Sequence, residues 1–394
     1  MKIAHLSTST TGGAAVTARS IARIQKSFGH DSEIFTRKNK LTATTLAKSR
    51  FSTFISLANA TPEYAQVSHF STLAVDLDTI WDFNPDVILI HNWFNLLRGK
   101  DIISITRRIP TVFVAHDARL ATGGCHITLG CQSFKTGCQD CPAAKIDWFA
   151  SVAKKSLDSM VNQLGKYAFV APSQWLMTEL MGSSIISNAT ISKVIGNPSE
   201  AFTNNEELST KHSSKHFKII FVSALLDSTY KGLDILIKSL QVIAASQDFA
   251  GEIDVKFVGK GNNRVFTGLD SRVNTSFLGQ LNSAEVHQLI GESDLLVVPS
   301  LSENYPGVIG EAQLLGCAVA ASNVGGIPEM IEDGVSGFLF EPDVHGCKTA
   351  ILRAINSPSL SQIKKFARER ALVRHDERRI NNDYENIIQE LINS

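Results

Sequence analysis

The sequence alternates short apolar segments with longer segments of helical spacing, and this alternation constrains its fold more than any other feature. Six segments of strand length occur in the first half of the chain: Lys2–Ser7, Ser32–Thr36, Asp86–His91, Thr111–Ala115, Tyr167–Ala171 and Ile191–Ile195. Six more occur in the second half: Lys218–Ser223, Asp254–Val258, Thr275–Leu278, Asp294–Pro299, Ala318–Ala321 and Gly337–Phe340. Most are continuous apolar runs, which is typical of strands buried on both faces of a parallel sheet. The pattern predicts a doubly wound α/β sheet in each half.

A polar segment divides the two halves. The chain has 394 residues, a length that suits two domains. Asn197-Pro198 is a turn signal, and few apolar residues follow it as far as Lys215. We therefore expect one domain over residues 1–197 and another over 215–375, with a cleft between them. Helices are predicted over Ser359–Val373 and Asp376–Ile392. Ligands of such sheets bind at the carboxyl ends of the strands, so the residues there are the first candidates for a site.

The composition excludes several classes of function. Lys and Arg number 38, as do Asp and Glu, whereas a dedicated nucleic-acid binder needs a basic surface. No stretch approaches the roughly 18–20 uninterrupted apolar residues of a membrane span. The N-terminus enters a strand pattern at once, without the apolar region of a signal peptide. We expect a cytoplasmic protein that binds no nucleic acid. Peripheral contact with the inner face of the plasma membrane stays open, because an amphipathic helix needs no targeting signal.

Two glycines and two histidines stand at strand ends in the first half. Gly12-Gly13 precedes a predicted helix over Ala14–Gly29, where bare backbone and the helix dipole would favour a phosphate or sugar. A plain tight turn would use the same residues. His116, after the fourth strand, is either a ligand contact or a structural hydrogen-bonding group. His91 has the same location one strand earlier.

The segment from Pro299 to Ala312 carries the strongest signal for chemistry. A strand ends, a loop containing Pro and Gly follows, and a helix begins near Gly307. Glu303 lies in the loop and Glu311 about one turn into the helix. The helix N-terminus would hold a pyrophosphate, and a carboxylate nearby can accept hydrogen bonds from two vicinal hydroxyls, as on ribose. Alternatively, these are a surface Glu and a Glu that favours the helix dipole.

Four of the six cysteines crowd into seventeen residues: Cys125, Cys131, Cys138 and Cys141. In a reducing compartment such a cluster is a metal site or a set of free thiols more often than disulfides. The last two form the C-x2-C half of a four-thiolate zinc site, whereas the first pair is more widely spaced and His126 could replace one thiolate. We expect structural zinc in this insert, at about residues 118–145. A metal would supply much of the folding energy of a segment with so few apolar residues.

Two further groups of side chains suggest contact with an acceptor sugar or with a membrane surface. Trp93 and Phe94 stand at a strand's carboxyl end, where aromatic faces suit stacking on a sugar. Lys154, Lys155 and Lys166 would meet either a membrane surface or solvent.

In this order and spacing the motifs resemble family 4 of the retaining glycosyltransferases, which has the two-domain GT-B fold. The resemblance covers nearly the whole chain. The motifs that carry it are Gly12-Gly13, His116-Asp117, Asn197-Pro198, Lys231-Gly232-Leu233-Asp234, Val258-Gly259-Lys260-Gly261, Phe277-Leu278-Gly279, Glu303 with Glu311, Gly325-Gly326-Ile327-Pro328-Glu329 and Asp333-Gly334-Val335-Ser336-Gly337-Phe338. It implies two doubly wound Rossmann-like α/β domains facing across a cleft, with a C-terminal helix at 376–394 returning to the first. The cysteine insert resembles one found in members that build bacterial exopolysaccharide, including colanic-acid-type enzymes.

The resemblance also implies roles for individual residues. Glu311 would bind the donor ribose. Glu303 would hold the transferred sugar and help to stabilise the transition state, and Lys231 would neutralise the departing diphosphate. His116 would contact the donor sugar as a third catalytic residue. Further donor-binding positions are Gly13, Asn304, Tyr305, Pro306, Gly307, Val308 and Leu281.

The implied activity is that of a retaining hexosyltransferase that needs no metal for catalysis. It would move a sugar from a UDP- or GDP-linked donor to a glycan or lipid-linked oligosaccharide, in the synthesis of bacterial surface polysaccharide. One departure concerns the phosphate site: many relatives carry an Arg where this chain reads Ser223-Ala224-Leu225-Leu226-Asp227. Lys231 alone, Lys260 or Arg119 would then supply the charge. The alternative is a non-catalytic or partner-dependent sugar-nucleotide-binding protein on the same fold.

Overall fold

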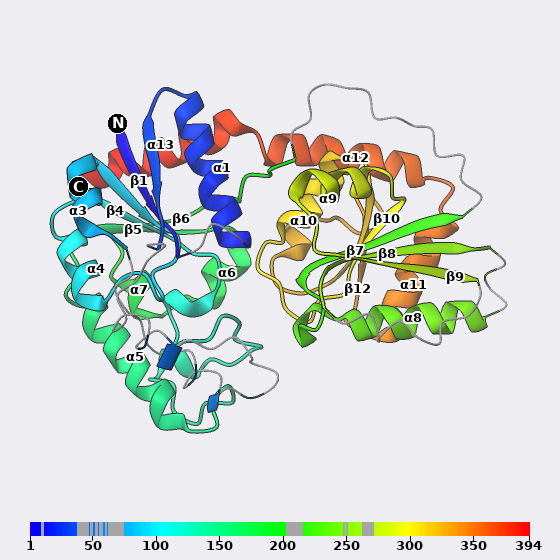
Figure 1. Ribbon diagram of the computed structural model, residues 1–394, viewed down its shortest axis with the longest axis horizontal. Coiled ribbons are helices and arrows are strands. Elements are labelled where there is room, and N and C mark those ends of the chain that lie inside the picture. The colour runs from blue at the N-terminus through cyan, green and yellow to red at the C-terminus, as the bar shows by residue number, and fades with distance from the viewer. Residues whose placement is uncertain are drawn as a thin grey trace. The chain divides into compact units, whose positions relative to one another are not determined.

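A computed structural model of the protein describes residues 1–8, 12–37, 47, 50–51, 54, 58–59, 61, 75–201, 216–246, 249, 251–261 and 272–394. These residues form two compact units, Met1–Pro198 with Glu377–Ser394 and Ser199–Asp376. Each unit is built on a parallel sheet of six strands flanked by helices (Figure 1). All twelve predicted strands are present among the described residues, and their ends lie within two residues of the predicted ones.

The sheet of the first unit has the strand order β2-β1-β3-β4-β5-β6. Its strands are β1 (Lys2–Leu6), β2 (Asp31–Phe35), β3 (Val87–Ile90), β4 (Thr111–Val114), β5 (Tyr167–Ala171) and β6 (Ile191–Val194). The described helices of this unit are α1 (Gly13–Ser27), α3 (Leu77–Phe83), α4 (Gly99–Thr106), α5 (Asp147–Val161), α6 (Gln174–Glu179), α7 (Ser184–Ser187) and α13 (Glu377–Asn393). The order reverses between β1 and β3, so the loops after these strands diverge and leave room for polar groups.

Both faces of this sheet are buried, because successive side chains of a strand point to opposite faces. Leu89 and Val112 belong to the cluster formed with α1 and α13. Ile88 and Phe113 belong to the cluster on the other face, which includes α4, α5 and the cysteine insert. Two covered faces explain why these strands are apolar throughout instead of alternating.

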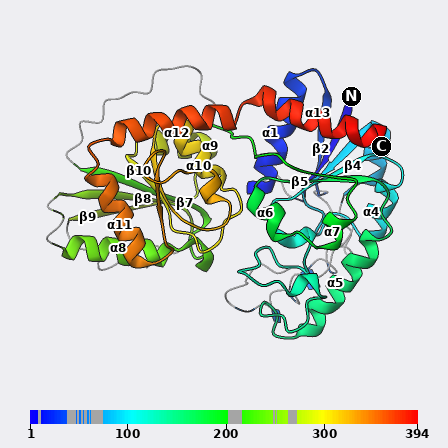
Figure 2. The same ribbon diagram turned by 180° about the vertical axis from the view of Figure 1, so that it is seen from behind.

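The C-terminal helix α13 packs on the first unit. Tyr384 and Ile388, one turn apart, are buried in the same cluster as β3, β4 and β5. Arg23 of α1 pairs with Glu377 at its start, with Nη2 2.7 Å from Oε1. Figures 1 and 2 both show this red helix beside the blue α1. The chain thus leaves the first unit after residue 198 and re-enters it at residue 377.

The sheet of the second unit has the order β12-β11-β10-β7-β8-β9. Its strands are β7 (Phe217–Leu225), β8 (Ile253–Lys260), β9 (Val273–Gly279), β10 (Leu295–Val298), β11 (Ala318–Ser322) and β12 (Phe338–Phe340). The described helices are α8 (Leu233–Ala245), α9 (Ser283–Gly291), α10 (Gly307–Leu314), α11 (Val344–Ile355) and α12 (Leu360–Arg374). Helices α8 and α11 pack on one face of the sheet, and α9 and α10 on the other (Figure 1). None of the helices in the described part of the chain has both the length and the apolar character of a membrane span.

Candidate functional site

Two loops meet where the strand order of the second sheet reverses, between β7 and β10. The chain after β7 reaches Lys231, and the chain after β10 reaches Glu303. Lys231 Nζ lies 2.6 Å from Glu303 Oε1, and Ser300 Oγ donates to the same oxygen over 2.9 Å. Ligands of open α/β sheets bind at such a reversal. The structure therefore brings two predicted site residues together at the expected place.

Two glycines allow these loops to come so close. Gly232 has φ 69°, and a Cβ on it would lie 1.9 Å from the carbonyl oxygen of Pro299. Gly325 has φ 59°, and a Cβ on it would lie 1.7 Å from the carbonyl oxygen of Glu303. Any side chain at either position would push the backbones apart. The separation of Lys231 and Glu303 is thus fixed by backbone packing as well as by their ion pair.

Lys231 is held as a cation. Its side chain is 26% exposed, and that of Glu303 is 11% exposed. Burial by itself would lower the pKa of Lys231, but the charge of Glu303, the neighbouring Tyr230 and the hydrogen bond to Glu303 outweigh burial and raise this pKa. The amine is therefore protonated at neutral pH. A partly desolvated ammonium with a fixed position suits the binding of a diphosphate.

Helix α10 begins directly after this loop, at the predicted Gly307. Glu311 is four residues into the helix, and its side chain is 17% exposed. One carboxylate oxygen lies 3.7 Å from the position of a Cβ on Gly307, so the side chain turns back towards the start of the helix. The other oxygen lies 3.7 Å from Nε2 of His287 on α9. Glu311 thus stands beside the first turn of the helix, where the backbone N–H groups point towards the N-terminus.

The other predicted donor positions of this unit lie in or next to the same region. Leu281, Tyr305 and Val308 are half-buried and pack on the apolar cluster between the sheet and helices α9 and α10. Asn304 and Pro306 are half-buried as well, and Gly307 is exposed. Leu281, Tyr305 and Val308 therefore lie on the face of the second sheet that helices α9 and α10 cover.

Gly12 and Gly13 begin α1 in the first unit. Gly12 is the N-cap with φ 88°, a backbone conformation that favours glycine. Among the described residues, no heavy atom lies within 4 Å of a Cβ placed on either glycine. The positive φ at position 12 therefore favours glycine there. At position 13 there is space for a side chain among the described residues.

A chain of three histidines crosses the first sheet at its own reversal. His5 Nδ1 lies 2.9 Å from His91 Nε2, and His91 Nδ1 lies 3.0 Å from His116 Nε2. Gln25 Oε1 of α1 lies 2.8 Å from His5 Nε2. Burial lowers the pKa of His5 and of His116 to about 4, and lowers that of His91 as well. All three imidazoles are therefore neutral at physiological pH.

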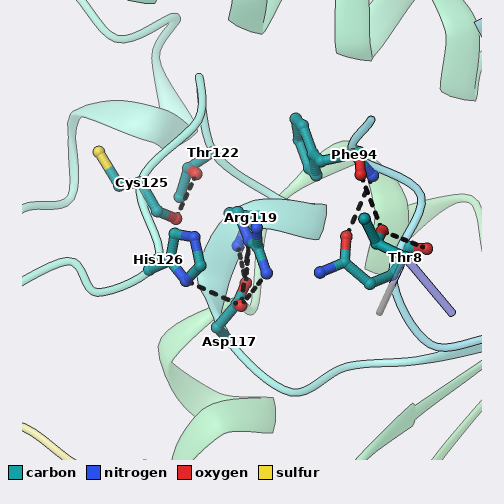
Figure 3. A network of polar contacts seen from close by, with 8 residues as sticks. Thr8, Phe94, Asp117, Arg119, Thr122, Cys125 and His126 are labelled. Carbon is teal, nitrogen blue, oxygen red and sulfur yellow. Dashed lines mark hydrogen bonds and ion pairs between the residues drawn. The ribbon is translucent and has the colours of Figure 1, made fainter. Parts of the chain in front are cut away.

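Figure 3 shows a polar network around Asp117, the residue that follows His116 in the chain. Arg119 Nη2 lies 2.7 Å from Asp117 Oδ2, and His126 Nδ1 lies 3.2 Å from the same oxygen. The guanidinium also lies over the ring of Phe94, 5.4 Å from its centroid. Burial would raise the pKa of Asp117, but the charge of Arg119 and the contact with His126 outweigh burial and lower it. Asp117 thus neutralises Arg119, one of the candidates to replace the missing phosphate-binding Arg.

The four clustered cysteines line one cavity of about 20 Å³, together with Thr122 and Phe134. A cavity of this volume is large enough for about one water molecule. The Cys125 thiol donates to the Cys141 sulfur, and this bond, with the N–H groups of Ala143 and Ala144, lowers the pKa of Cys141 to about 7. Burial raises the pKa of Cys138 to about 11. Within the described residues, no three His, Cys, Asp or Glu side chains are grouped as a metal ion would require. Structural zinc therefore stays a prediction.

The structure corrects two expectations about exposed side chains. Trp93 is 4% exposed and packs edge-on against Phe113, 5.5 Å between ring centroids, so it belongs to the core and is closed to a sugar. Lys154 is 3% exposed and pairs with Asp158 on the same helix, so it cannot meet a membrane. Both predictions failed because strand ends and amphipathic helices also supply buried positions.

Sequence reasoning missed His5 and Gln25, which the fold places at the end of the histidine chain. A signal existed for His5, since it interrupts the apolar strand Lys2–Leu6. Gln25 lies in a helix with no motif around it. Ser300 and His287 were also missed, because only their distance from the two glutamates distinguishes them.

Comparison with known families supports the interpretation of the second unit. Residues 216–357, which lie within the second unit, match the family model described as Glycosyl transferases group 1. Sulfoquinovosyl transferase SQD2 of Arabidopsis thaliana is 34% identical over 142 residues, which are 34% of this chain and 27% of that protein. The uncharacterized glycosyltransferase MJ1178 of Methanocaldococcus jannaschii is 28% identical over 185 residues, 43% of this chain and 49% of that protein. The chain thus spans less than half of the length of these curated relatives.

Solved structures resemble nearly the whole chain. Anabaena Alr3699/HepE, solved in complex with UDP, matches with a TM-score of 0.62 at 20% identity, over 99% of this chain and 100% of that one. Sucrose-phosphate synthase from Thermosynechococcus elongatus matches with a TM-score of 0.66 at 15% identity, over 99% of each chain. These similarities confirm the predicted fold class, two Rossmann-like α/β domains of the GT-B kind.

Proposed function

We propose that this protein is a glycosyltransferase that moves a sugar from a nucleotide-diphospho-sugar to an acceptor hydroxyl. One observation carries the proposal: Lys231 and Glu303 form an ion pair at the strand reversal of a unit that matches the Glycosyl transferases group 1 model. The pair lies next to the N-terminus of α10, where backbone N–H groups favour a diphosphate. Glu311 is the carboxylate for the two ribose hydroxyls.

The roles of the two paired residues follow from their charges. The Lys231 ammonium neutralises the diphosphate as the bond from the sugar carbon to the phosphate oxygen breaks. Glu303 accepts hydrogen bonds from the transferred sugar and stabilises the positive charge that develops on it. The new bond forms from the acceptor oxygen to the same sugar carbon, on the face that the phosphate leaves. The acceptor proton passes to the leaving phosphate, so the anomeric configuration is retained and no catalytic metal is used.

UDP is the first donor nucleotide to test, because Alr3699/HepE was solved with UDP and with UDP-glucose. The acceptor we propose is a glycan or a lipid-linked oligosaccharide of a bacterial surface polysaccharide. One related sequence is an uncharacterized protein from a cps region of Klebsiella pneumoniae, 32% identical over 109 residues, which are 28% of this chain and 29% of that protein. Such a reaction would take place in the cytoplasm, at the inner face of the plasma membrane.

Calorimetric titration with UDP, GDP and their glucose-linked forms tests the donor site. We expect one nucleotide to bind, and Glu311→Ala to weaken its binding about tenfold to a hundredfold, since hydrogen bonds to a charged group are lost. Glu369→Ala removes an exposed carboxylate of the same unit and should bind like the wild type. The outcome that contradicts the donor site is equal binding by Glu311→Ala and the wild type.

Transfer itself is tested by nucleotide release in the presence of candidate acceptors, with the anomeric configuration of the product read by NMR. Retention supports the proposed chemistry, and inversion rules it out. Nucleotide binding without release for any acceptor would favour the alternative, a sugar-nucleotide-binding protein that depends on a partner or is not catalytic. The pairing of Arg119 with Asp117 is the observation behind that alternative, since one of the candidates to replace the missing phosphate-binding Arg is already neutralised.

A further inference from the structure

We propose that Ser300 is a positioning residue that holds Oε1 of Glu303 when the Lys231 ammonium turns to the donor diphosphate. Oε2 of Glu303 thereby stays directed at the transferred sugar. The inference deepens the proposed function and rests on it, because the diphosphate and the sugar are those of the proposed donor. Its structural part, the hold of Ser300 on Glu303, can be tested without a donor.

One oxygen of the Glu303 carboxylate receives two hydrogen bonds. Lys231 Nζ lies 2.6 Å from Oε1, and Ser300 Oγ donates to the same oxygen over 2.9 Å. Among the described residues, both hydrogen bonds to this carboxylate go to Oε1. The Glu303 side chain is only 11% exposed, so water has little access to it. Oε2 therefore keeps its lone pairs for a hydroxyl of the transferred sugar.

Lys231 is a poor anchor for Glu303 during the reaction. A diphosphate carries more negative charge than a carboxylate, so it attracts the ammonium as the bond to the sugar breaks. The Tyr230 ring, with its centroid 5.2 Å from Lys231 Nζ, stabilises the ammonium without using an N–H group. N–H groups thus remain for the diphosphate. The bond from Lys231 to Oε1 weakens at the step in which the sugar becomes positively charged and needs Glu303.

Ser300 does not share this weakness. It lies just beyond the end of β10 and is 1% exposed. Its neutral hydroxyl is not drawn to a diphosphate as a cation is, and a short side chain loses little conformational entropy when it is held. The N–H of the next residue, Leu301, donates to the Tyr230 carbonyl over 2.8 Å. The loop of Ser300 is therefore fixed through its backbone, whatever the Lys231 side chain does.

The backbone of Glu303 is fixed as well, but this does not fix its carboxylate. The Glu303 carbonyl accepts from the N–H of Gly326 over 3.2 Å. A glutamate side chain still rotates about three bonds beyond such a contact. The hydrogen bond from Ser300 supplies the constraint that the backbone lacks once Lys231 has turned away.

Crystal structures of two variants without any ligand test this hold directly. Lys231→Ala reproduces the state in which the ammonium has left Glu303. We expect Oε1 to stay within hydrogen-bond distance of Ser300 Oγ in Lys231→Ala, and the carboxylate to turn away in Lys231→Ala/Ser300→Ala. A carboxylate that is displaced already in Lys231→Ala would show that Ser300 cannot hold it. One that keeps its place in the double variant would show that the backbone is sufficient, and either result would overturn the proposal.

Kinetics separate positioning from a merely structural role. We expect Ser300→Ala to lower kcat about tenfold and to leave the affinity for UDP unchanged, since UDP has no sugar to meet Glu303. Ser302→Ala removes another buried hydroxyl of the same loop and should keep both values. Loss of UDP affinity together with kcat in Ser300→Ala would indicate general disturbance of the site and would overturn the positioning role. A wild type that neither binds a nucleotide nor transfers a sugar would contradict the proposed function instead, and the crystal structures still decide whether Ser300 holds Glu303.

A double-mutant cycle shows through which residue Ser300 acts. Glu303→Ala and Ser300→Ala/Glu303→Ala should have the same kcat, because Ser300 has no effect once the carboxylate is gone. A further loss in the double variant would show that Ser300 acts by another route and would overturn its assignment to Glu303.

Discussion

The two units place polar groups at equivalent positions of their sheets, but the electrical character of these groups differs. In the second unit the reversal between β7 and β10 holds an ion pair, Lys231 with Glu303. In the first unit the reversal between β1 and β3 holds neutral rings, His5 and His91. The same topology thus supports a charged site and an uncharged one. The topology determines where polar residues can lie, and the residues determine what they bind.

Desolvation explains the difference. Lys231 is partly exposed and retains its charge because Glu303 compensates it. His5 and His91 are almost fully buried, and the contact between them involves no carboxylate, so burial keeps them neutral. A charged site can bind an anionic diphosphate, whereas neutral imidazole rings can only donate or accept a hydrogen bond. The two units should therefore differ in their response to mutation and to acid.

The largest expected effect is the loss of the ion pair. Lys231→Ala and Glu303→Ala should each lower the rate of sugar transfer about a hundredfold to a thousandfold, as the loss of one preorganised electrostatic group does. His116→Ala should cost about tenfold, because it removes one hydrogen bond to a neutral group. Steady-state nucleotide release measures all three. Lys238→Ala removes an exposed lysine of the same unit and should stay near the wild type. The comparison fails if His116→Ala is the slowest variant.

The next effect is acid sensitivity confined to the first unit. An unfolded histidine protonates at a pH of about 6.5, while His5 stays neutral in the folded state down to about 4. Between these values the unfolded state binds more protons, so the free energy of unfolding falls as the pH falls. The loss is about 3 kcal/mol from His5 alone. All four tryptophans lie in the first unit, so their fluorescence in denaturant titrations reports on it.

A matched measurement on the second unit completes this test. Hydrogen exchange of peptides from β7 and β10 at pH 7 and pH 5 should change less than that of peptides from β1 and β3. His5→Gln replaces the titrating ring with a neutral group and should flatten the pH dependence of the tryptophan signal. An equal loss of protection in both units would remove the contrast.

The cysteine insert should add stability to the first unit only. We expect one zinc ion per chain by elemental analysis, and none in a Cys138→Ser/Cys141→Ser variant. Zinc at about a hundredfold above its dissociation constant would stabilise the folded state by about 3 kcal/mol, so a chelator should lower the tryptophan-detected midpoint. Unchanged zinc content in the variant would exclude these two cysteines as ligands. Cys317→Ser, a buried cysteine of the second unit, is the control.

The insert variant also tests a role in acceptor recognition. The insert follows His116 directly in the chain, so loss of its structure should reduce transfer while nucleotide binding stays intact. Normal transfer by the Cys138→Ser/Cys141→Ser variant would remove this role. Loss of nucleotide binding as well would indicate general unfolding of the chain.

The smallest effect concerns the surface, where the two units should behave alike. Arg23 with Glu377 in the first unit and Arg353 with Asp333 in the second are partly exposed ion pairs. Glu377→Ala and Arg353→Ala should each lower the free energy of unfolding by less than about 1 kcal/mol, because solvent screens such pairs. Differential scanning calorimetry measures both. A loss above about 2 kcal/mol for Glu377→Ala would mean that α13 depends on this contact.

The fold was largely predictable because strands that are buried on both faces of a sheet form continuous apolar runs in the sequence. All twelve predicted strands are present among the described residues. Gly307 was correctly predicted as the start of α10, because a proline and a glycine follow an apolar strand there. The predictions for Trp93 and Lys154 failed, since a strand end or a helix does not reveal which side chains the next layer will cover.

The candidate site was predictable only in part. Glu303 and Glu311 stand out because each follows a strand or begins a helix in a recognisable loop. Ser300, His287 and Gln25 carry no such signal. Each is identified only by its contact in the structure, Ser300 with Glu303, His287 with Glu311 and Gln25 with His5. Long-range hydrogen bonds of this kind depend on how helices and strands pack.

The sequence by itself determined the number of strands and their positions along the chain, the division into two halves, and the residue types available at strand ends. It did so because hydrophobic periodicity and turn residues act locally, within a few positions of the chain. Only the tertiary structure decided which of those residues form an ion pair or a hydrogen bond with one another. The 2.6 Å contact of Lys231 with Glu303 and the alignment of His5, His91 and His116 join residues up to 111 positions apart. Strand order sets such distances, and desolvation by the surrounding core then sets the charge of each group.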